Sequence, residues 1–232
     1  MIKLIKLVES NEGWASEVVF TRKLLQQVKD LKRPSLKYLG VINRIEIPVG
    51  GKNVLLFDRD KNYIRTRSID DIIKVADQSS KSDIIINGKG VSIKSFVGSS
   101  PSIASRINRS NFEKLIEKIN ISDKTSFMSS IDEHYKMCAE KEIPCTLKAS
   151  DEPYSKINSS DWEKLINYLA FQGTATKDSR NPADYVLEIS GKHHSFKVYT
   201  RQEFAQTMID RVRLWIVVTE KGWSLNIRMV EQ

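Results

Sequence analysis

The chain of 232 residues is basic, with 37 Lys and Arg against 29 Asp and Glu, a net charge of +8 and a sequence pI near 9.3. Its hydrophobic content of 40% and charged content of 28% exclude a disordered chain and provide for one sizeable core. The excess of positive charge favours a polyanionic partner, of which nucleic acid is the commonest. A basic surface that is merely solvated is the alternative.

The two cysteines, Cys138 and Cys145, are too few for a disulfide framework and lack the neighbouring histidine pairs of a zinc site. We therefore expect reduced thiols and a cytoplasmic protein. No apolar run approaches the roughly 18 residues that a membrane-spanning helix needs, so no membrane partner is expected.

The first third of the sequence predicts a helix followed by an antiparallel meander. Apolar residues recur at helical spacing from about Gly13 to Leu31, and Pro34 limits the helix beyond that point. Glu17 lies inside this helix, where the pattern alone indicates an exposed residue. Runs of β-type residues follow at 38–49, 53–58 and 63–67, separated by turn residues, and a short helix is predicted at 69–78.

The next stretch predicts a β-hairpin that brings candidate catalytic side chains together at one end. Two β-type runs, 83–86 and 91–96, flank a turn that begins with Asn87-Gly88, a strong hairpin signal because both central residues of the turn need φ > 0. In an antiparallel pair, Asp83 lies across from the Ser92–Lys94 end of the second strand. A carboxylate that holds Mg²⁺ beside a lysine is suited to phosphodiester cleavage. The alternative is an ordinary hairpin on which Lys94 is a surface lysine.

A second predicted hairpin offers a rival site. Asp184 begins the run 184–188, and Lys197 lies in the run 195–199, so the same chemistry is conceivable there. His193 and His194 fall at its turn, where they would add acid/base groups. Periodicity does not separate the two hairpins.

The remaining elements alternate between loops, helices and strands. We expect a Gly/Ser loop at 98–105 and a basic polar loop at 173–182. Helices are predicted at 111–120 with Ser110 as its cap, at 125–141, at 162–171 after a Ser159-Ser160-Asp161 cap, and at 201–214. A buried strand is predicted at 215–218 and a last strand at 223–230.

Several of these segments resemble a known enzyme family. Asp83 followed by Ser92-Ile93-Lys94 resembles the PD-(D/E)xK nuclease motif, with serine in the second acidic place. The longer run, Ser92-Ile93-Lys94-Ser95 followed by Gly98, Pro101 and Asn111-Phe112, resembles the HpaII-type restriction endonucleases. Weaker likeness extends to the Gly13–Glu17 run, the 173–182 loop and Ser224–Arg228, whereas residues 120–160 match nothing in the family.

The resemblance implies an α/β (α+β) fold with a PD-(D/E)xK nuclease-like core: a central mixed β-sheet flanked by helices, with an extra helical segment and a C-terminal β-hairpin. We expect one domain over 1–232. Its parts are an N-terminal helix and meander (1–80), the catalytic hairpin and following helix (81–120), a helical insert (121–172) and a C-terminal α/β part (173–232).

The resemblance also implies the site. Asp83, Ser92, Lys94 and Glu17 are the expected catalytic residues, and Mg²⁺ is the expected cofactor. Its ligands would be the Asp83 and Glu17 carboxylates and the Ile93 backbone carbonyl. Since Ser92 stands where a carboxylate is usual, Glu17 would restore the missing negative charge. The motif places the active site in the first hairpin rather than the second.

Contacts with double-stranded DNA are expected from the loops. A Gly/Ser loop that carries Arg and Asn approaches a phosphate backbone closely, and Arg and Asn read guanine and adenine respectively. Plain solvated loops are the alternative. The candidates are Ser95, Ser99, Ser102, Arg106, Asn108 and Arg109 in the first region and Lys177 and Arg180 in the second.

The function expected from these observations is that of a type II restriction endonuclease that cleaves double-stranded DNA with Mg²⁺, and the resemblance suggests CCGG as its site. Cleavage of both strands requires either a homodimer on DNA or sequential nicking, and the sequence does not distinguish them. Two alternatives remain open: a structure-specific repair nuclease with the same core, and a non-enzymatic basic DNA-binding module.

Overall fold

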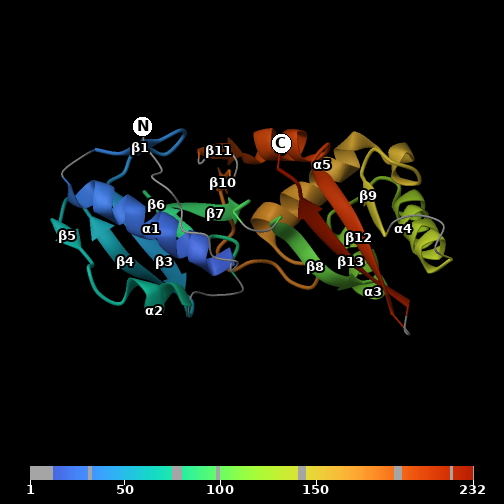
Figure 1. Ribbon diagram of the computed structural model, residues 1–232, viewed down its shortest axis with the longest axis horizontal. Helices are drawn as coiled ribbons and strands as arrows, with labels where there is room; N and C mark the ends of the chain where they lie inside the picture. Colours follow the sequence, from blue (N-terminus) through green and yellow to red (C-terminus); the bar gives the residue numbers. More distant parts are fainter. Residues whose placement is uncertain are drawn as a thin grey trace. The chain divides into compact units, whose positions relative to one another are not determined.

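The computed structural model describes residues 13–30, 33–74, 80–97, 100–140, 145–190, 195–219 and 222–231. Backbone contacts divide the chain into two compact units, Met1–Ser99 with Ser179–Arg201 and Ser100–Asp178 with Gln202–Gln232 (Figure 1). The C-terminal part predicted at 173–232 therefore contributes strands to both units.

The first unit is built on a seven-stranded mixed sheet with the order β11-β10-β7-β6-β3-β4-β5. Strands β7 and β10 are parallel, and the other neighbouring strands are antiparallel. Parallel neighbours need a long connection, and here most of the second unit lies between β7 and β10 in the sequence. The strands are β3 (Arg44–Val49), β4 (Lys52–Asp58), β5 (Tyr63–Ile64), β6 (Ile84–Ile86), β7 (Lys89–Ser95), β10 (Tyr185–Ile189) and β11 (Phe196–Thr200); β1 (Ser35–Leu36) and β2 (Gly40–Val41) form a separate pair.

Two helices, α1 (Gly13–Lys29) and α2 (Ile69–Lys74), complete this unit, and Figure 1 shows α1 running along the sheet. The apolar residues of α1 recur three and four positions apart, so they form one face that is buried in the core of the unit. The mixed sheet flanked by helices confirms the predicted α/β class. The core joins Val18, Leu24, Leu25 and Val28 of α1 with Ile84, Ile86, Val91 and Ile93 of β6 and β7.

The predicted hairpin turn is confirmed. Asn87 and Gly88 have φ of 51° and 77°, and Ile86 pairs with Lys89 across the turn. The Asn87 side chain also anchors the turn: its oxygen accepts the amides of Asn43 and Arg44, and its nitrogen donates to the carbonyls of Leu39 and Val41 at 3.0 and 2.8 Å.

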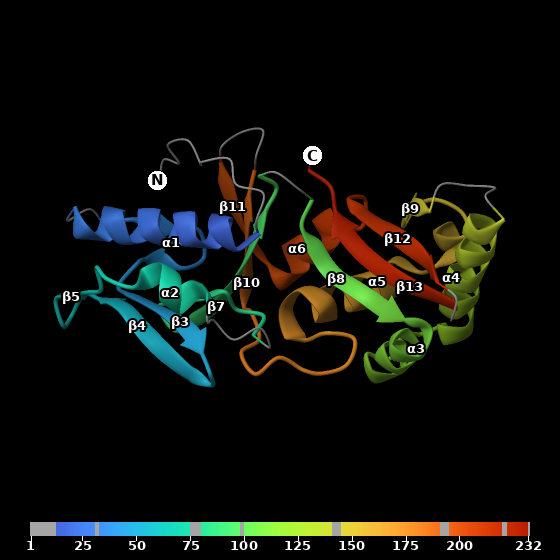
Figure 2. The same cartoon turned by 60° about the horizontal axis from the view of Figure 1, so that its bottom comes forward.

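The second unit contains a four-stranded antiparallel sheet with the order β8-β13-β12-β9. In Figure 2, α5 passes behind β8 and β13. The strands are β8 (Ser102–Asn108), β9 (Thr146–Lys148), β12 (Val212–Thr219) and β13 (Gly222–Met229). The helices are α3 (Arg109–Lys118), α4 (Lys124–Ala139), α5 (Ser159–Asn167), a π-helical turn (Tyr168–Gln172) and α6 (Arg201–Met208), of which Gln202 onward belongs to this unit.

Some predicted boundaries are wrong. The segment expected to be a loop at 98–105 contains the start of strand β8, and the helix expected at 201–214 ends at Met208 because β12 begins at Val212. The alternation of buried Val212, Leu214 and Ile216 fits a strand with one covered face better than a helix, and the prediction of a buried strand at 215–218 is wrong because Trp215 and Val217 lie on its exposed face.

The capping residues also differ from those predicted. Asn108 rather than Ser110 caps α3, and Asn158 rather than the following serines caps α5; in both cases the asparagine oxygen accepts a backbone N–H of the first turn.

Within the described residues, no helix is both long and apolar enough to cross a membrane. Cys138 and Cys145 are not joined by a disulfide. Burial raises the pKa of the Cys138 thiol to about 12, aided by its hydrogen bond with Cys145.

Candidate active site

Asp83 lies at the start of β6, directly across from the Ser92–Lys94 segment of β7. The pairing of Ile84 with Val91 sets this register, and the Asp83 amide donates to the Val91 carbonyl at 3.0 Å. The Asp83 Oδ2 atom accepts the Ile93 amide at 2.5 Å and the Ser92 hydroxyl at 3.3 Å. As predicted, Asp83 lies at the end of the hairpin, and its carboxylate is fixed by hydrogen bonds from β7, the strand that also carries Lys94.

Two opposing influences act on the Asp83 carboxyl. Burial raises its pKa, whereas the Lys94 ammonium, the Ile93 amide, the Ser92 hydroxyl and the Lys81 ammonium lower it; the net pKa is raised. A carboxylate in this position needs positive charge nearby to stay ionised. The site is therefore suited to a cation at the carboxylate.

Glu17 joins this group from α1, far away in the sequence. Burial and the neighbouring Asp83 charge raise the pKa of Glu17, the Lys94 charge lowers it, and the net result is a pKa of about 8. Such mutual effects act over short distances, and α1 contacts β7, the strand that carries Lys94. Three elements thus contribute to one site: α1 with Glu17, the start of β6 with Asp83, and β7 with Ser92 and Lys94.

Lys81 is a member of the site that the sequence reasoning missed. Burial and the Lys94 charge lower the pKa of its ammonium, Asp83 raises it, and the net result is a pKa of about 8. Its backbone is held in place because its amide donates to the Ser179 hydroxyl at 2.8 Å and to the Asn181 carbonyl at 3.1 Å. The available signal was a lysine two residues before Asp83, which is too common a pattern to select by itself.

The donor set fits a hard divalent cation. Glu17 and Asp83 are half-buried carboxylates, and the Asp83 charge raises the proton affinity of Glu17, so a cation between them would relieve their repulsion; oxygen donors are what Mg²⁺ prefers. Among the described residues, both hydrogen bonds of the Asp83 carboxylate go to Oδ2, which leaves Oδ1 for a metal.

The set of protein ligands is small. No group of three or more His, Cys, Asp or Glu that could hold a metal occurs in the described part of the chain. Two carboxylates with neutral oxygens around them would leave most positions of Mg²⁺ to water and phosphate, which is usual for this ion. The residue in the second acidic place of the motif, Ser92, is 1% exposed and donates to Asp83, so it orients that carboxylate.

The rival hairpin keeps its acid and its lysine apart. Asp184 Oδ2 accepts the Gly90 amide at 2.9 Å, and the Asp184 amide donates to the Gly90 carbonyl at 2.8 Å, so this residue joins β10 to the first hairpin. Lys197 pairs with Glu188, four positions along the strand from Asp184 and thus about 13 Å away by strand rise. His193 and His194 lie outside the described residues.

The residues expected to contact DNA are distributed over both units. Ser95 accepts the Val97 amide at its hydroxyl, and Ser99 lies outside the described residues. Ser102 and Arg106 lie on β8, where Arg106 has φ of 55° and its amide donates to the Asn226 side chain at 3.0 Å. Lys177 and Arg180 are exposed, Lys177 in the second unit and Arg180 in the first.

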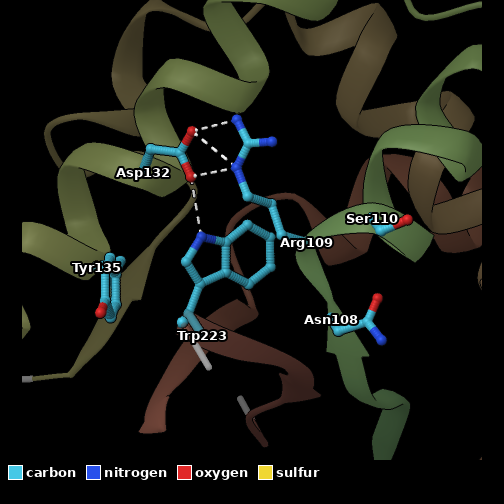
Figure 3. Close-up of a pocket in the computed structure, with 7 residues that line it drawn as sticks. Asn108, Arg109, Ser110, Asp132, Tyr135 and Trp223 are labelled. Atoms are coloured by element: carbon cyan, nitrogen blue, oxygen red, sulfur yellow. Dashed lines mark hydrogen bonds and ion pairs between the residues drawn. The ribbon is translucent and has the colours of Figure 1, made fainter. Parts of the chain in front are cut away.

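Asn108 and Arg109 have structural partners. Asn108 caps α3, and Arg109 forms a two-pronged ion pair with Asp132, at 3.0 Å from Nε and 2.7 Å from Nη2. Asp132 also accepts the Trp223 indole N–H at 2.9 Å, as Figure 3 shows. Burial opposes ionisation of Asp132, but these hydrogen bonds prevail and lower its pKa. Together they connect α3, α4 and β13.

Comparison of the whole chain with family models, with curated proteins and with solved structures gave no match.

Proposed function

We propose that this protein is a type II restriction endonuclease that hydrolyses phosphodiester bonds of double-stranded DNA with Mg²⁺. The observation that carries the proposal is the convergence of Glu17, Asp83 and Lys94, together with Lys81, at one end of a mixed sheet. Acids and amines with perturbed pKa values in one place are typical of catalytic sites. The basic net charge of +8 suits a DNA substrate.

The residues of the predicted motif, together with Glu17, each have a part in this reaction. Asp83 and Glu17, with the Ile93 carbonyl, would hold the cation. A bound Mg²⁺ supplies positive charge against the phosphate oxygens and lowers the pKa of nearby water. Ser92 and the Ile93 amide orient the Asp83 carboxylate by their hydrogen bonds. Lys94 orients the attacking water and balances the negative charge that develops on the phosphate in the transition state.

The experiment that tests this proposal is digestion of unmethylated phage and plasmid DNA in Mg²⁺ by the wild type, Lys94→Ala and Lys197→Ala. We expect discrete fragments from the wild type and from Lys197→Ala, and none from Lys94→Ala or in EDTA. Lys197 is the matched control because it is an exposed lysine on a strand of the same sheet. The fragment sizes also test CCGG as the recognition site.

The other outcomes lead to different conclusions. Fragments without fixed ends would indicate a nuclease that recognises structure instead of sequence. Activity lost with Lys197→Ala and kept in Lys94→Ala would move the site to the second hairpin. A pure wild type that binds DNA but never cuts it would refute the enzyme and leave a basic binding module.

A further inference from the structure

The sheet of the second unit has one covered face and one open face. Alternate residues such as Leu214, Ile216, Leu225 and Ile227 are buried, and helices α3 and α4 contact the strands. The intervening residues project to the other face, which Figure 2 shows in front of α5. On β12 these include Trp215 and Val217, which are 40% and 39% exposed.

Positive charges form a row across this open face. Lys148 on β9 pairs with Arg213 on β12, and Arg213 pairs with Arg228 on β13; the next position of the row, on β8, is Ser102. Like charges directly opposite each other in a sheet are destabilising. A bound anion would offset this repulsion, so the row is suited to an anionic ligand.

Nothing on the sheet compensates these charges. The four strands contain no Asp or Glu, although they carry four basic residues, the fourth being Arg106. In the described part of the chain, Lys148, Arg213 and Arg228 have no ion pair; the Arg213 guanidinium donates to the carbonyls of Asp210 and Val212 at 3.1 Å.

An aromatic residue lies beside the row. Trp215 pairs with Thr146 and with Asn226, so it occupies the adjacent row on the same face. The Arg228 guanidinium lies over its ring, 4.7 Å from the centroid. Such stacking holds the guanidinium outstretched, and exposed aromatic rings among cations are typical of nucleic-acid-binding surfaces.

We propose that the open face of the β8-β13-β12-β9 sheet binds the phosphate backbone of duplex DNA through Lys148, Arg213 and Arg228, with Trp215 packed beside them. The choice of DNA as the polyanion rests on the proposed nuclease function; the surface itself rests on the register and charges of the sheet. Ser102 and Arg106 belong to this face, whereas Asn108 and Arg109 are engaged in capping α3 and binding Asp132.

The test uses a fluorescein-labelled 30-base-pair duplex of mixed sequence, in EDTA, with the full chain. Fluorescence anisotropy measures affinity as a function of NaCl concentration for the wild type, Lys148→Gln/Arg228→Gln and a control, Lys124→Gln/Lys136→Gln. The control loses the same two charges from exposed positions on α4.

Loss of two phosphate contacts should reduce the slope of log K against log [NaCl] by about 2 and weaken binding on the order of tens of fold at 0.1 M salt. The control should keep the wild-type slope. Lys148→Arg should bind as the wild type does, because it keeps the positive charge that Lys148→Gln removes. Circular dichroism shows whether each variant is folded, and Trp215→Ala, with Trp215→Phe as its conservative partner, tests the face without altering charge.

Equal affinities and slopes for the two double variants would overturn the inference. So would a double variant that keeps its DNA affinity but loses self-association in sedimentation, because the face would then join two copies of the chain. If the wild type never cleaves DNA but binds it through this face, the proposed function fails and the inference stands. If the wild type cleaves DNA and the double variant binds it normally, the proposed function stands and the inference about this face fails.

Discussion

The Asp83 carboxylate accepts the Ile93 amide at 2.5 Å, a bond that a backbone carbonyl would accept in an uninterrupted antiparallel ladder. The side chain thus continues the pairing of β6 with β7 beyond Ile84, where β6 begins. One residue therefore fixes the end of the hairpin and presents a negative charge beside Lys94. A substitution at Asp83 that keeps the hydrogen bond but removes the charge separates these two roles.

Replacement of Asp83 by Asn should leave the fold nearly intact and abolish cleavage. The amide oxygen of Asn accepts the same hydrogen bond, but the negative charge that would hold the metal is lost. We expect cleavage to fall by at least a factor on the order of 10³, measured by initial rates on plasmid DNA. Asp184→Asn is the control because that carboxylate also accepts a backbone amide. Comparable losses in the two variants would contradict the assignment.

The raised pKa of Glu17 predicts a loss of stability with increasing pH. Between its ordinary value of 4.5 and about 8, the folded protein holds a proton that the unfolded chain releases. The free energy of unfolding should therefore fall across this range by an amount on the order of 3 kcal/mol from this residue. Urea denaturation in EDTA at pH 5 and pH 8 should show the fall in the wild type and a smaller one in Glu17→Gln.

Below pH 8, the pH dependence of stability from Glu17 can be measured without a contribution from Lys81. Because the pKa of Lys81 is lowered, the unfolded chain holds a proton on Lys81 between about pH 8 and pH 10.5 that the folded protein has released. The contribution of Lys81 therefore increases the free energy of unfolding with pH only in that higher range. Parallel stability curves for wild type and Glu17→Gln below pH 8 would show that Glu17 is not buried beside Asp83.

Mg²⁺ should stabilise the folded protein, and more so at high pH. A cation that binds the folded state alone raises the free energy of unfolding, and protonation of Glu17 competes with its binding. With about 10 mM MgCl₂ we expect the melting temperature to rise by a few degrees at pH 8 and by less at pH 6. NaCl of equal ionic strength is the control. An equal rise in Asp83→Asn would place the metal elsewhere.

Gly90 is required by close packing against the segment that precedes β10. A Cβ at this position would collide with the Ser82 hydroxyl and lie 2.7 Å from the Pro182 carbonyl oxygen. Since the hydroxyl itself donates to that carbonyl, neither group moves freely. Gly90→Ala should lower the free energy of unfolding by about 1–3 kcal/mol, measured by urea denaturation. Lys89→Ala, an exposed change in the same turn, should have little effect.

Arg109 should act on stability and not on DNA affinity. Its guanidinium is paired with Asp132, which also accepts the Trp223 indole N–H (Figure 3). Because the pair is half exposed, Arg109→Gln should cost about 1 kcal/mol in unfolding free energy. Anisotropy with the same labelled duplex should give wild-type affinity. A loss of affinity matching that of Arg228→Gln would assign Arg109 to the DNA-binding surface.

Local sequence determined the elements whose signals are short-range. Asn87-Gly88 predicted the hairpin because few residues adopt the positive φ of its turn, and the same register placed Asp83 across from Ser92. The periodicity of α1 likewise predicted a helix from Gly13, which ends at Lys29 rather than Leu31. These features depend on a few consecutive residues, so the sequence alone suffices for them.

Tertiary structure decided everything that depends on distant segments. Only packing of α1 in the core of the first unit brings Glu17 beside Asp83, and only the sheet register distinguishes Lys94 from Lys197. Strand β8 was predicted as a loop because its Ser, Arg and Asn residues suit either state, and pairing with β13 selected the strand. The row of Lys148, Arg213 and Arg228 likewise arises from strands up to 80 residues apart, whose alignment no local pattern encodes.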